Sequence, residues 1–242
     1  MRFEDFSPLL EAILEQNKLS HLLAEGVTAR FHALTERMLE VNKSMNLTAI
    51  TDEAAVALLH YADSLTVARF LPEGARLCDV GCGAGFPCLP LAIVRPDLSI
   101  LALDSTEKRI RYVSETARLL GCEQLEATAA RAEEAGKGAL RESFDVVTAR
   151  AVASLPMLAE LCLPLVRPGG VFLAMKAKKG EEETEQASTA IKRLGGEIVA
   201  LHDVTLRHGE REETRVIVEV AKRKHTPAEF PRAWAKILKK PL

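Results

Sequence analysis

Apolar positions in the first seventy residues recur at the spacing of amphipathic helices. They fall every three or four residues in 3–14, in 31–41 and again in 56–70, which predicts three helical segments. Between the last two, the run NKSMNLTAITD (42–52) is rich in Asn, Ser and Thr and is typical of a loop. These patterns predict an N-terminal helical extension over residues 1–71 that packs on the rest of the chain.

The pattern changes at Pro72-Glu73-Gly74, where short apolar runs of strand length begin to alternate with helical stretches. One helix is predicted to begin at Ser105 or Thr106 and to end at Gly121, and another covers 181–194. The alternation predicts an α/β domain over 72–242, with a parallel sheet covered on both faces. Ligands of such sheets bind beyond the carboxyl ends of the strands. The predicted strands are 75–80, 98–104, 125–130, 144–149, 170–175, 197–206 and 214–220.

Composition favours a cytoplasmic protein. The 242 residues contain no apolar run of the length that crosses a membrane. Acidic residues interrupt the apolar pattern at the N-terminus, which argues against a signal peptide. The five cysteines are odd in number and form no C-x-x-C pair, which indicates free thiols and neither disulfides nor a metal site.

The charge is unevenly distributed. The whole chain has a net charge of −2, yet residues 221–242 carry seven Lys or Arg against one Glu. A basic tail on an acidic body is consistent with a nucleic-acid partner. The alternative is a solvated tail that only aids solubility.

The run CDVGCGAGFPCLP (78–90) follows the first predicted strand. Glycine there accepts a positive φ and brings the backbone close to a ligand. A dinucleotide fingerprint would place its third glycine at position 86, which is Phe86, and Pro87 and Pro90 lack the N–H groups that a pyrophosphate requires. The turn therefore favours a nucleoside ligand without phosphates. Its three glycines are Gly81, Gly83 and Gly85.

Further candidates follow the next three strands. Asp104 ends the second strand, where a carboxylate accepts hydrogen bonds from ribose hydroxyls; the alternative is a helix cap. The run RAEEA (131–135) follows the third strand and offers a backbone N–H and a carboxylate to an adenine edge. Arg150 follows the fourth strand and suits a carboxylate, a phosphate or a nearby acidic side chain.

In these segments the chain resembles class I S-adenosylmethionine-dependent methyltransferases, and more narrowly the glucose-inhibited division protein B (GidB, RsmG) family. The resemblance spans nearly the whole chain in order. It rests on the stretches NLTAI (46–50), HYADSL (60–65), DVGCGAGFPCLPLAI (79–93), LDSTEKR (103–109), RAE (131–133), VTARAVASL (147–155), LAELCLPL (158–165), GGVFLAMKA (169–177) and FPRAWAKILKKPL (230–242).

The resemblance implies a Rossmann-like, mostly parallel seven-stranded sheet and a methyltransferase that uses S-adenosylmethionine to methylate N7 of a guanine in small-subunit (16S) ribosomal RNA. Two positions depart from the family pattern, Cys88 and Ala177, where glycine is frequent. The implied cofactor contacts in this sequence are Gly81, Gly83, Gly85, Phe86, Ala132, Glu133 and Arg150, with Asp104, Ser105 and Thr106 at the ribose end.

Guanine N7 carries a lone pair in the neutral base, so no general base is required, and we assign no catalytic residue. His60 and Asp63 either face the site or form a buried pair, and Trp234 either stacks on a base or packs in the core. Candidate RNA contacts are the basic side chains of Lys176, Lys178, Lys179, Arg207, His208, Arg211 and the tail. For Lys178 and Lys179 the alternative is a solvated start of the next helix.

Two other functions stay open. The same fold can methylate a protein or a small molecule, and a non-catalytic RNA-binding factor in ribosome assembly is a second alternative. The intact glycine turn and Asp104 favour an enzyme over the latter. A dehydrogenase is disfavoured by Phe86 and the two prolines. No heptad or repeat demands assembly, so we expect a monomer.

Overall fold

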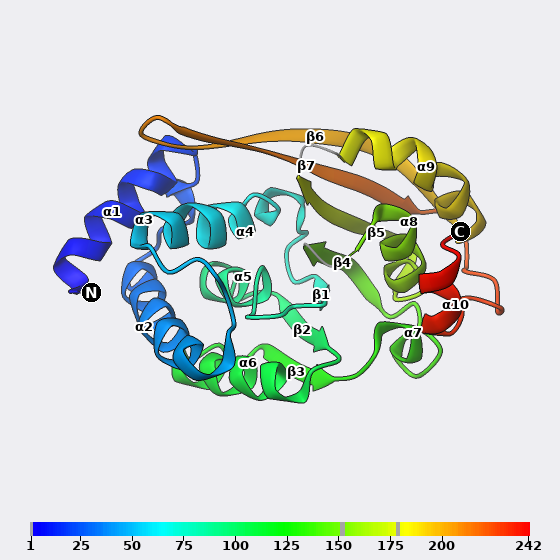
Figure 1. The fold of residues 1–242 in the computed structure, drawn as a ribbon, viewed down its shortest axis with the longest axis horizontal. Helices are drawn as coiled ribbons and strands as arrows, with labels where there is room; N and C mark the ends of the chain where they lie inside the picture. Colours follow the sequence, from blue (N-terminus) through cyan, green and yellow to red (C-terminus); the bar gives the residue numbers. More distant parts are fainter. Residues whose placement is uncertain (1, 151–152, 178–179) are drawn as a thin grey trace.

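The computed structural model describes residues 2–150, 153–177 and 180–242 of the chain. A seven-stranded sheet lies at its centre, with helices on both faces (Figure 1). All seven predicted strands are confirmed, with ends that shift by a few residues. They are β1 (Arg76–Val80), β2 (Ser99–Asp104), β3 (Leu125–Ala129), β4 (Phe144–Arg150), β5 (Val166–Ala177), β6 (Gly196–His208) and β7 (Arg211–Lys222).

The sheet order is β3-β2-β1-β4-β5-β7-β6. Strands β1 to β5 run parallel, whereas β7 is antiparallel to both β5 and β6. Strand order reverses beside β1, since Val80 pairs with Leu103 of β2 on one side and with Ala149 of β4 on the other. The turn after β1 therefore lies at the switch point of the sheet, where open α/β sheets bind ligands.

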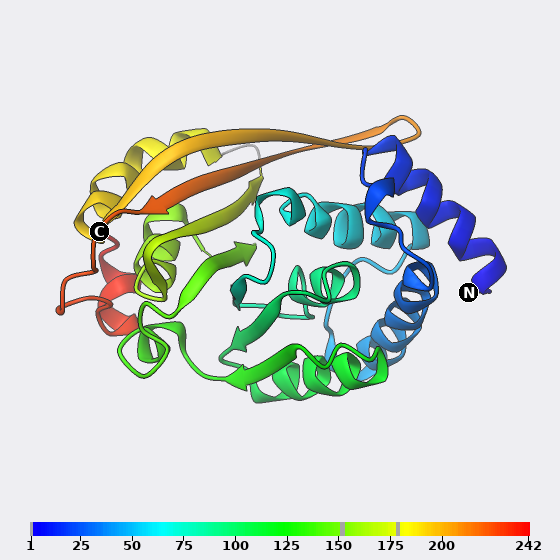
Figure 2. The same ribbon diagram turned by 180° about the vertical axis from the view of Figure 1, so that it is seen from behind.

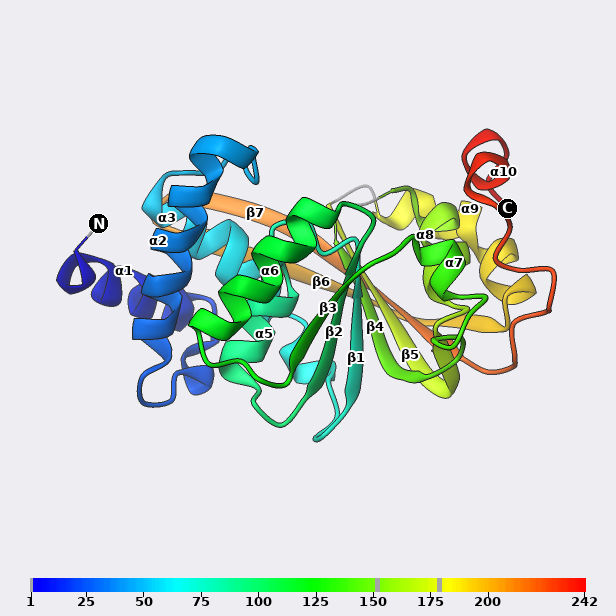
Figure 3. The same cartoon turned by 90° about the horizontal axis from the view of Figure 1, so that it is seen from below.

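Helices divide between the two faces of the sheet (Figure 3). One face carries α5 (Cys88–Val94) and α6 (Glu107–Leu119) together with the N-terminal helices. The other carries α7 (Ala132–Ala135), α8 (Leu155–Cys162), α9 (Gly180–Arg193) and α10 (Trp234–Lys239). The central strands β1, β2 and β4 are mostly buried because both of their faces are covered, whereas β3 and β6 leave many of their side chains exposed.

The N-terminal segment forms the helices α1 (Phe3–Gln16) and α2 (Val27–Met45), as predicted. Their apolar stripes share one hydrophobic cluster with the sheet, in which Phe6 and Phe31 join Leu77 of β1 and Ile100 of β2. Burial of this common core fixes the helices against the strands.

The third predicted helical segment, 56–70, is helical but is not a regular α-helix. It consists of α3 (Glu53–Val56), a π-helical stretch η2 (Ala57–Ala62), α4 (Asp63–Leu65) and a 3-10 turn η3 (Ala68–Phe70). Its His60, Asp63, Ser64 and Leu65 are nevertheless all buried. Wide turns of this kind occur often at functional sites, and this one places polar side chains next to the glycine turn.

The β6–β7 hairpin extends beyond the sheet and over the N-terminal helices (Figure 2). Its far end is tied to the end of α1 by the Asn17 amide, which donates to the Arg207 carbonyl at 2.8 Å and accepts from the Arg207 N–H at 2.8 Å. Within the described ranges, no helix combines the length and apolar character that a membrane crossing requires.

Candidate functional site

Two cavities open side by side at the carboxyl ends of the parallel strands. The larger has a volume of about 870 Å³ and the smaller about 360 Å³. Gly81 and Arg109 line both of them. A ligand with two distinct halves can therefore extend from one cavity into the other past the glycine turn.

The glycine turn holds its shape through positive φ angles. These are 71° at Gly81, 56° at Gly83 and 87° at Gly85. A Cβ at Gly83 would meet only the Gly81 carbonyl, at 3.9 Å, and Gly83 lines the larger cavity. Added side-chain atoms at this position would therefore extend toward the ligand space.

Gly85 has a different environment from the other two glycines. It is absent from the described lining of both cavities, and a Cβ there would lie 2.3 Å from the Leu89 side chain. Because Gly85 has no side chain, α5 can pack closely beneath the turn. The contact between Gly85 and a cofactor thus stays a prediction, while its packing role is visible.

Asp79 lies beneath the turn, fully buried. One carboxylate oxygen accepts from the Thr148 hydroxyl at 3.0 Å, and the other accepts from the Cys88 N–H at the start of α5 at 3.2 Å. Burial raises the pKa of Asp79 to about 6 despite these bonds. Asp79 therefore already uses one of the N–H groups at the start of α5 that a pyrophosphate would need.

Asp104 joins the turn to the helix that follows β2. Its carboxylate accepts from the Gly83 N–H at 3.1 Å and from the Thr106 N–H at 2.8 Å. A carboxylate has about four lone-pair positions, so acceptor capacity remains for ribose hydroxyls in the smaller cavity. Thr106 occupies the cap position of α6, one of the two positions predicted for the start of this helix, and its side chain makes no cap bond. Ser105 and Thr106 line the smaller cavity, as does Asp104.

The far side of the smaller cavity comes from the segment after β3 and from the C-terminal tail. Ala132 and Glu133 both line it, and the Arg131 guanidinium pairs with the Glu133 carboxylate. Trp234 of α10 also lines this cavity and lies beneath Arg131, whose guanidinium carbon is 5.2 Å from the indole centroid.

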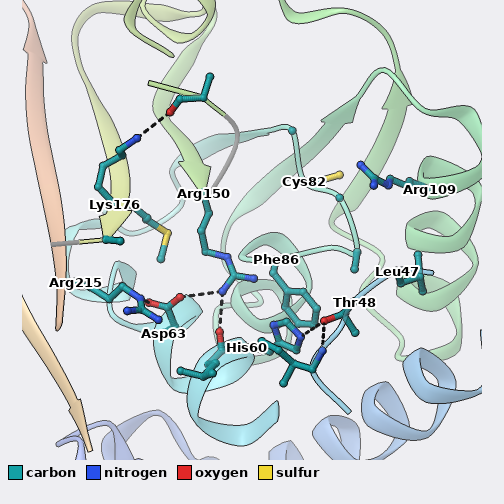
Figure 4. A pocket seen from close by; sticks show the side chains of 18 residues that line it. Leu47, Thr48, His60, Asp63, Cys82, Phe86, Arg109, Arg150, Lys176 and Arg215 are labelled. Carbon is teal, nitrogen blue, oxygen red and sulfur yellow. Dashed lines mark hydrogen bonds and ion pairs between the residues drawn. The ribbon is translucent and has the colours of Figure 1, made fainter. Parts of the chain in front are cut away.

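Arg150 lines the larger cavity (Figure 4). Its guanidinium donates to the Asp63 carboxylate at 2.9 Å and to the Leu59 carbonyl at 2.9 Å. Arg215 of β7 lies 3.6 Å from the other Asp63 oxygen. Asp63 thus pairs with two arginines, and the buried His60–Asp63 pair that the sequence left open is replaced by this cluster.

His60 lies flat against Phe86 of the glycine turn, with ring centroids 4.3 Å apart and planes inclined by 4°. Its Nε2 shares a 2.9 Å hydrogen bond with the Thr48 hydroxyl. Burial, with a smaller contribution from Arg150, lowers the pKa of His60 to about 3. The imidazole is therefore neutral near pH 7, and its stack with Phe86 forms an apolar wall of the larger cavity (Figure 4).

Not every side chain that was predicted to contact RNA lies at the two cavities. Lys176 lines the larger cavity and donates to the Ala153 carbonyl at 2.8 Å. The side chains of Arg207 and Arg211 instead pair with Glu212 and Glu213 on the β6–β7 hairpin, outside the described cavity linings. The predicted contacts Lys178 and Lys179 lie outside the described residues.

Sequence reasoning gave no role to several side chains that line the larger cavity. Arg215 is one of them, because its position follows from the antiparallel placement of β7 beside β5. Arg109 and Thr48 are others, and both lie in stretches that carried the family resemblance. The described residues contain no cluster of metal-ligand side chains, and all five cysteines are buried free thiols.

Comparison with known proteins gives a family match and a fold match. The family model for rRNA small subunit methyltransferase G (GidB) matches residues 28–212. A Lactobacillus delbrueckii subsp. bulgaricus protein named ribosomal RNA small subunit methyltransferase G is 44% identical over 231 residues, which cover 93% of this chain and 96% of that protein.

Solved structures match the fold at low sequence identity. M. jannaschii TYW2 in complex with AdoMet superposes with a TM-score of 0.54 at 15% identity, over 66% of this chain and 74% of that one. The [4+2]-cyclase SpnF gives a TM-score of 0.56 at 17% identity, over 80% and 95%. The predicted Rossmann-like class I fold is confirmed. Because a cyclase has it too, the fold alone does not specify the reaction.

Proposed function

We propose, from the premise that this chain belongs to the rRNA small subunit methyltransferase G (GidB) family, that it transfers the methyl group of S-adenosylmethionine to N7 of one guanine in 16S ribosomal RNA. The observation that carries the proposal is the pair of adjacent cavities at the switch point of the sheet, both lined by Gly81 and Arg109. One suits a nucleoside, and the other is large enough to admit a base beside the reactive end of the cofactor.

The smaller cavity holds the adenosine half of the cofactor. The Asp104 carboxylate accepts hydrogen bonds from the ribose hydroxyls, and the Ala132-Glu133 segment lies at the adenine edge. Gly81 and Gly83 let the turn approach the ligand closely, and Phe86 and Arg150 border the amino-acid half in the larger cavity. Bound S-adenosylmethionine supplies an electrophilic methyl group.

The chain's own task is to align the guanine and to keep water away. N7 attacks through its lone pair and needs no proton removed, which agrees with the neutral His60 ring. Alignment of this kind contributes most when the surrounding side chains are rigid. The Arg150–Asp63–Arg215 cluster and the His60–Phe86 stack supply that rigidity.

Ribosomal RNA reaches the larger cavity across a positively charged rim. Arg109, Lys176 and Arg215 lie around the cavity, and such side chains hold phosphates while a splayed base enters. On this proposal the protein acts as a monomer in the cytoplasm on 16S ribosomal RNA, free or within the small subunit. Five buried thiols suit a reducing compartment.

The test uses purified protein, methyl-labelled S-adenosylmethionine, and small-subunit RNA from cells that lack this protein, both naked and in assembled subunits. We expect label at a single guanine, located by strand cleavage specific to N7-methylguanine. Label at another RNA atom, in protein or in a small molecule would contradict the proposal. Cofactor binding with no transfer to either RNA preparation would favour the non-catalytic assembly factor.

A further inference from the structure

The C-terminal tail contributes an aromatic wall to the smaller cavity. Trp234 is the first residue of α10, and it lines that cavity together with residues that follow β2 and β3. The indole is partly buried against the hydrophobic cluster beneath α8. Packing against this cluster accounts for the buried part of the indole. The rest of the indole lines the cavity and is available to a ligand.

The position of Trp234 is fixed by a strong anchor two residues earlier. Arg232 donates its backbone N–H and its side-chain Nε to one oxygen of Glu160 at 2.8 Å, and its Nη2 to the other at 2.6 Å. Glu160 of α8 is fully buried. After Trp234, Ile237 is also fully buried. The tryptophan is therefore held on both sides along the chain.

Two charged side chains lie beside the indole at this cavity. The Arg131 guanidinium lies 5.2 Å from the indole centroid and also pairs with Glu133, the carboxylate expected at the adenine edge. Tryptophan stacks well on nucleobases, because both offer extended π surfaces, and such stacking does not need phosphate contacts. These properties match a purine in this cavity.

We propose that Trp234 is a cofactor-binding residue whose indole packs against the purine of the bound nucleoside, so that the C-terminal tail completes the cofactor site. This assignment rests on the proposed function, because it takes the ligand of the smaller cavity to be S-adenosylmethionine. It also assigns the tail a role at the cofactor in addition to any contact of its lysines with RNA.

The wild-type protein provides the first test, since Trp234 is the single tryptophan of the chain. Titration with S-adenosylhomocysteine is expected to change the tryptophan emission with the same midpoint as the heat of binding measured by calorimetry. Adenosine is expected to change the emission as well, and methionine alone to leave it unchanged. A clear heat of binding with constant emission would overturn the assignment.

The second test compares variants. Trp234→Ala is expected to weaken S-adenosylhomocysteine binding about tenfold, and Trp234→Phe to recover most of the affinity. Leu238→Ala is the matched control, because Leu238 is on the same helix and 59% exposed. Equal affinities for wild type and Trp234→Ala would refute the role of Trp234. Failure of the wild-type protein to bind S-adenosylhomocysteine would instead refute the proposed function.

Discussion

The Arg150 guanidinium, at the end of β4, lies 2.9 Å from the carboxylate of Asp63 in the N-terminal segment. The two residues are 87 positions apart in the chain. Both side chains are mostly buried, with exposed fractions of 15% for Arg150 and 7% for Asp63. This ion pair therefore ties the helical N-terminal segment to the sheet directly at the larger cavity, and it connects folding with the shape of the site.

Replacement of Asp63 by Asn tests that connection. Two arginines would then face a neutral amide, and we expect the free energy of unfolding to fall by about 2 kcal/mol. The methyl-transfer rate should fall at least tenfold, because Arg150 loses the partner that fixes it. Urea unfolding and a transfer assay measure the two effects. Asp203→Asn, at an exposed site on β6, is the control; equal losses in both variants would contradict the special role of Asp63.

Replacement of Gly83 or Gly85 by Ala is expected to change different properties of the protein. Gly85→Ala places a Cβ 2.3 Å from buried Leu89, which should lower stability by about 2–4 kcal/mol. A Cβ at Gly83 would make only an ordinary contact, with the Gly81 carbonyl at 3.9 Å, so the stability cost of Gly83→Ala should be about 1 kcal/mol. The affinity of Gly83→Ala for S-adenosylhomocysteine should nevertheless fall sharply, because the added methyl group extends toward the ligand space. Calorimetry and urea unfolding of both variants check this, and an unaltered affinity in Gly83→Ala would contradict the cavity assignment.

The lowered pKa of His60 predicts that the stability of the fold depends on pH. Its pKa is about 3 in the folded protein and about 6.5 in the unfolded chain. As the pH falls below 6.5, the unfolded state gains a proton that the folded state does not, so stability decreases. The loss from this group should reach about 2 kcal/mol between pH 7.5 and pH 5.

Urea unfolding at several pH values measures this effect, with His60→Gln as the reference. The stability difference between wild type and His60→Gln should shrink by that amount on acidification. A constant difference would show that the His60 ring takes up a proton in the folded state as readily as in the unfolded chain.

Replacement of Arg232 by Ala should release the tail. It leaves the Glu160 carboxylate, which is fully buried, without its guanidinium partner, a change that typically costs about 3–5 kcal/mol. The emission of Trp234 should shift to longer wavelength as the indole becomes exposed. Arg232→Lys should keep part of the stability. An emission spectrum in Arg232→Ala identical to that of wild type would show that the tail is held by other contacts.

Much of the fold follows from local pattern. Short runs of strand length between helical stretches located every strand, and the glycine turn with Asp104 predicted where the ligand site lies. These features are visible in the sequence because each depends on burial or on backbone conformation within a few residues. The division into residues 1–71 and 72–242 remains a prediction, although the core shared by Phe6 and Leu77 shows that the two parts pack together.

The sequence by itself determined the layered α/β architecture, the preference of the glycine turn for a nucleoside ligand without phosphates, and the family resemblance. Tertiary structure alone decided which charged and aromatic side chains meet. The pairing of Asp63 with Arg150 and Arg215, and the placement of Trp234 beside Arg131, join segments far apart in the chain. Local periodicity records which side of an element is buried, whereas partners of this kind depend on how separate elements are packed and on the order of the strands.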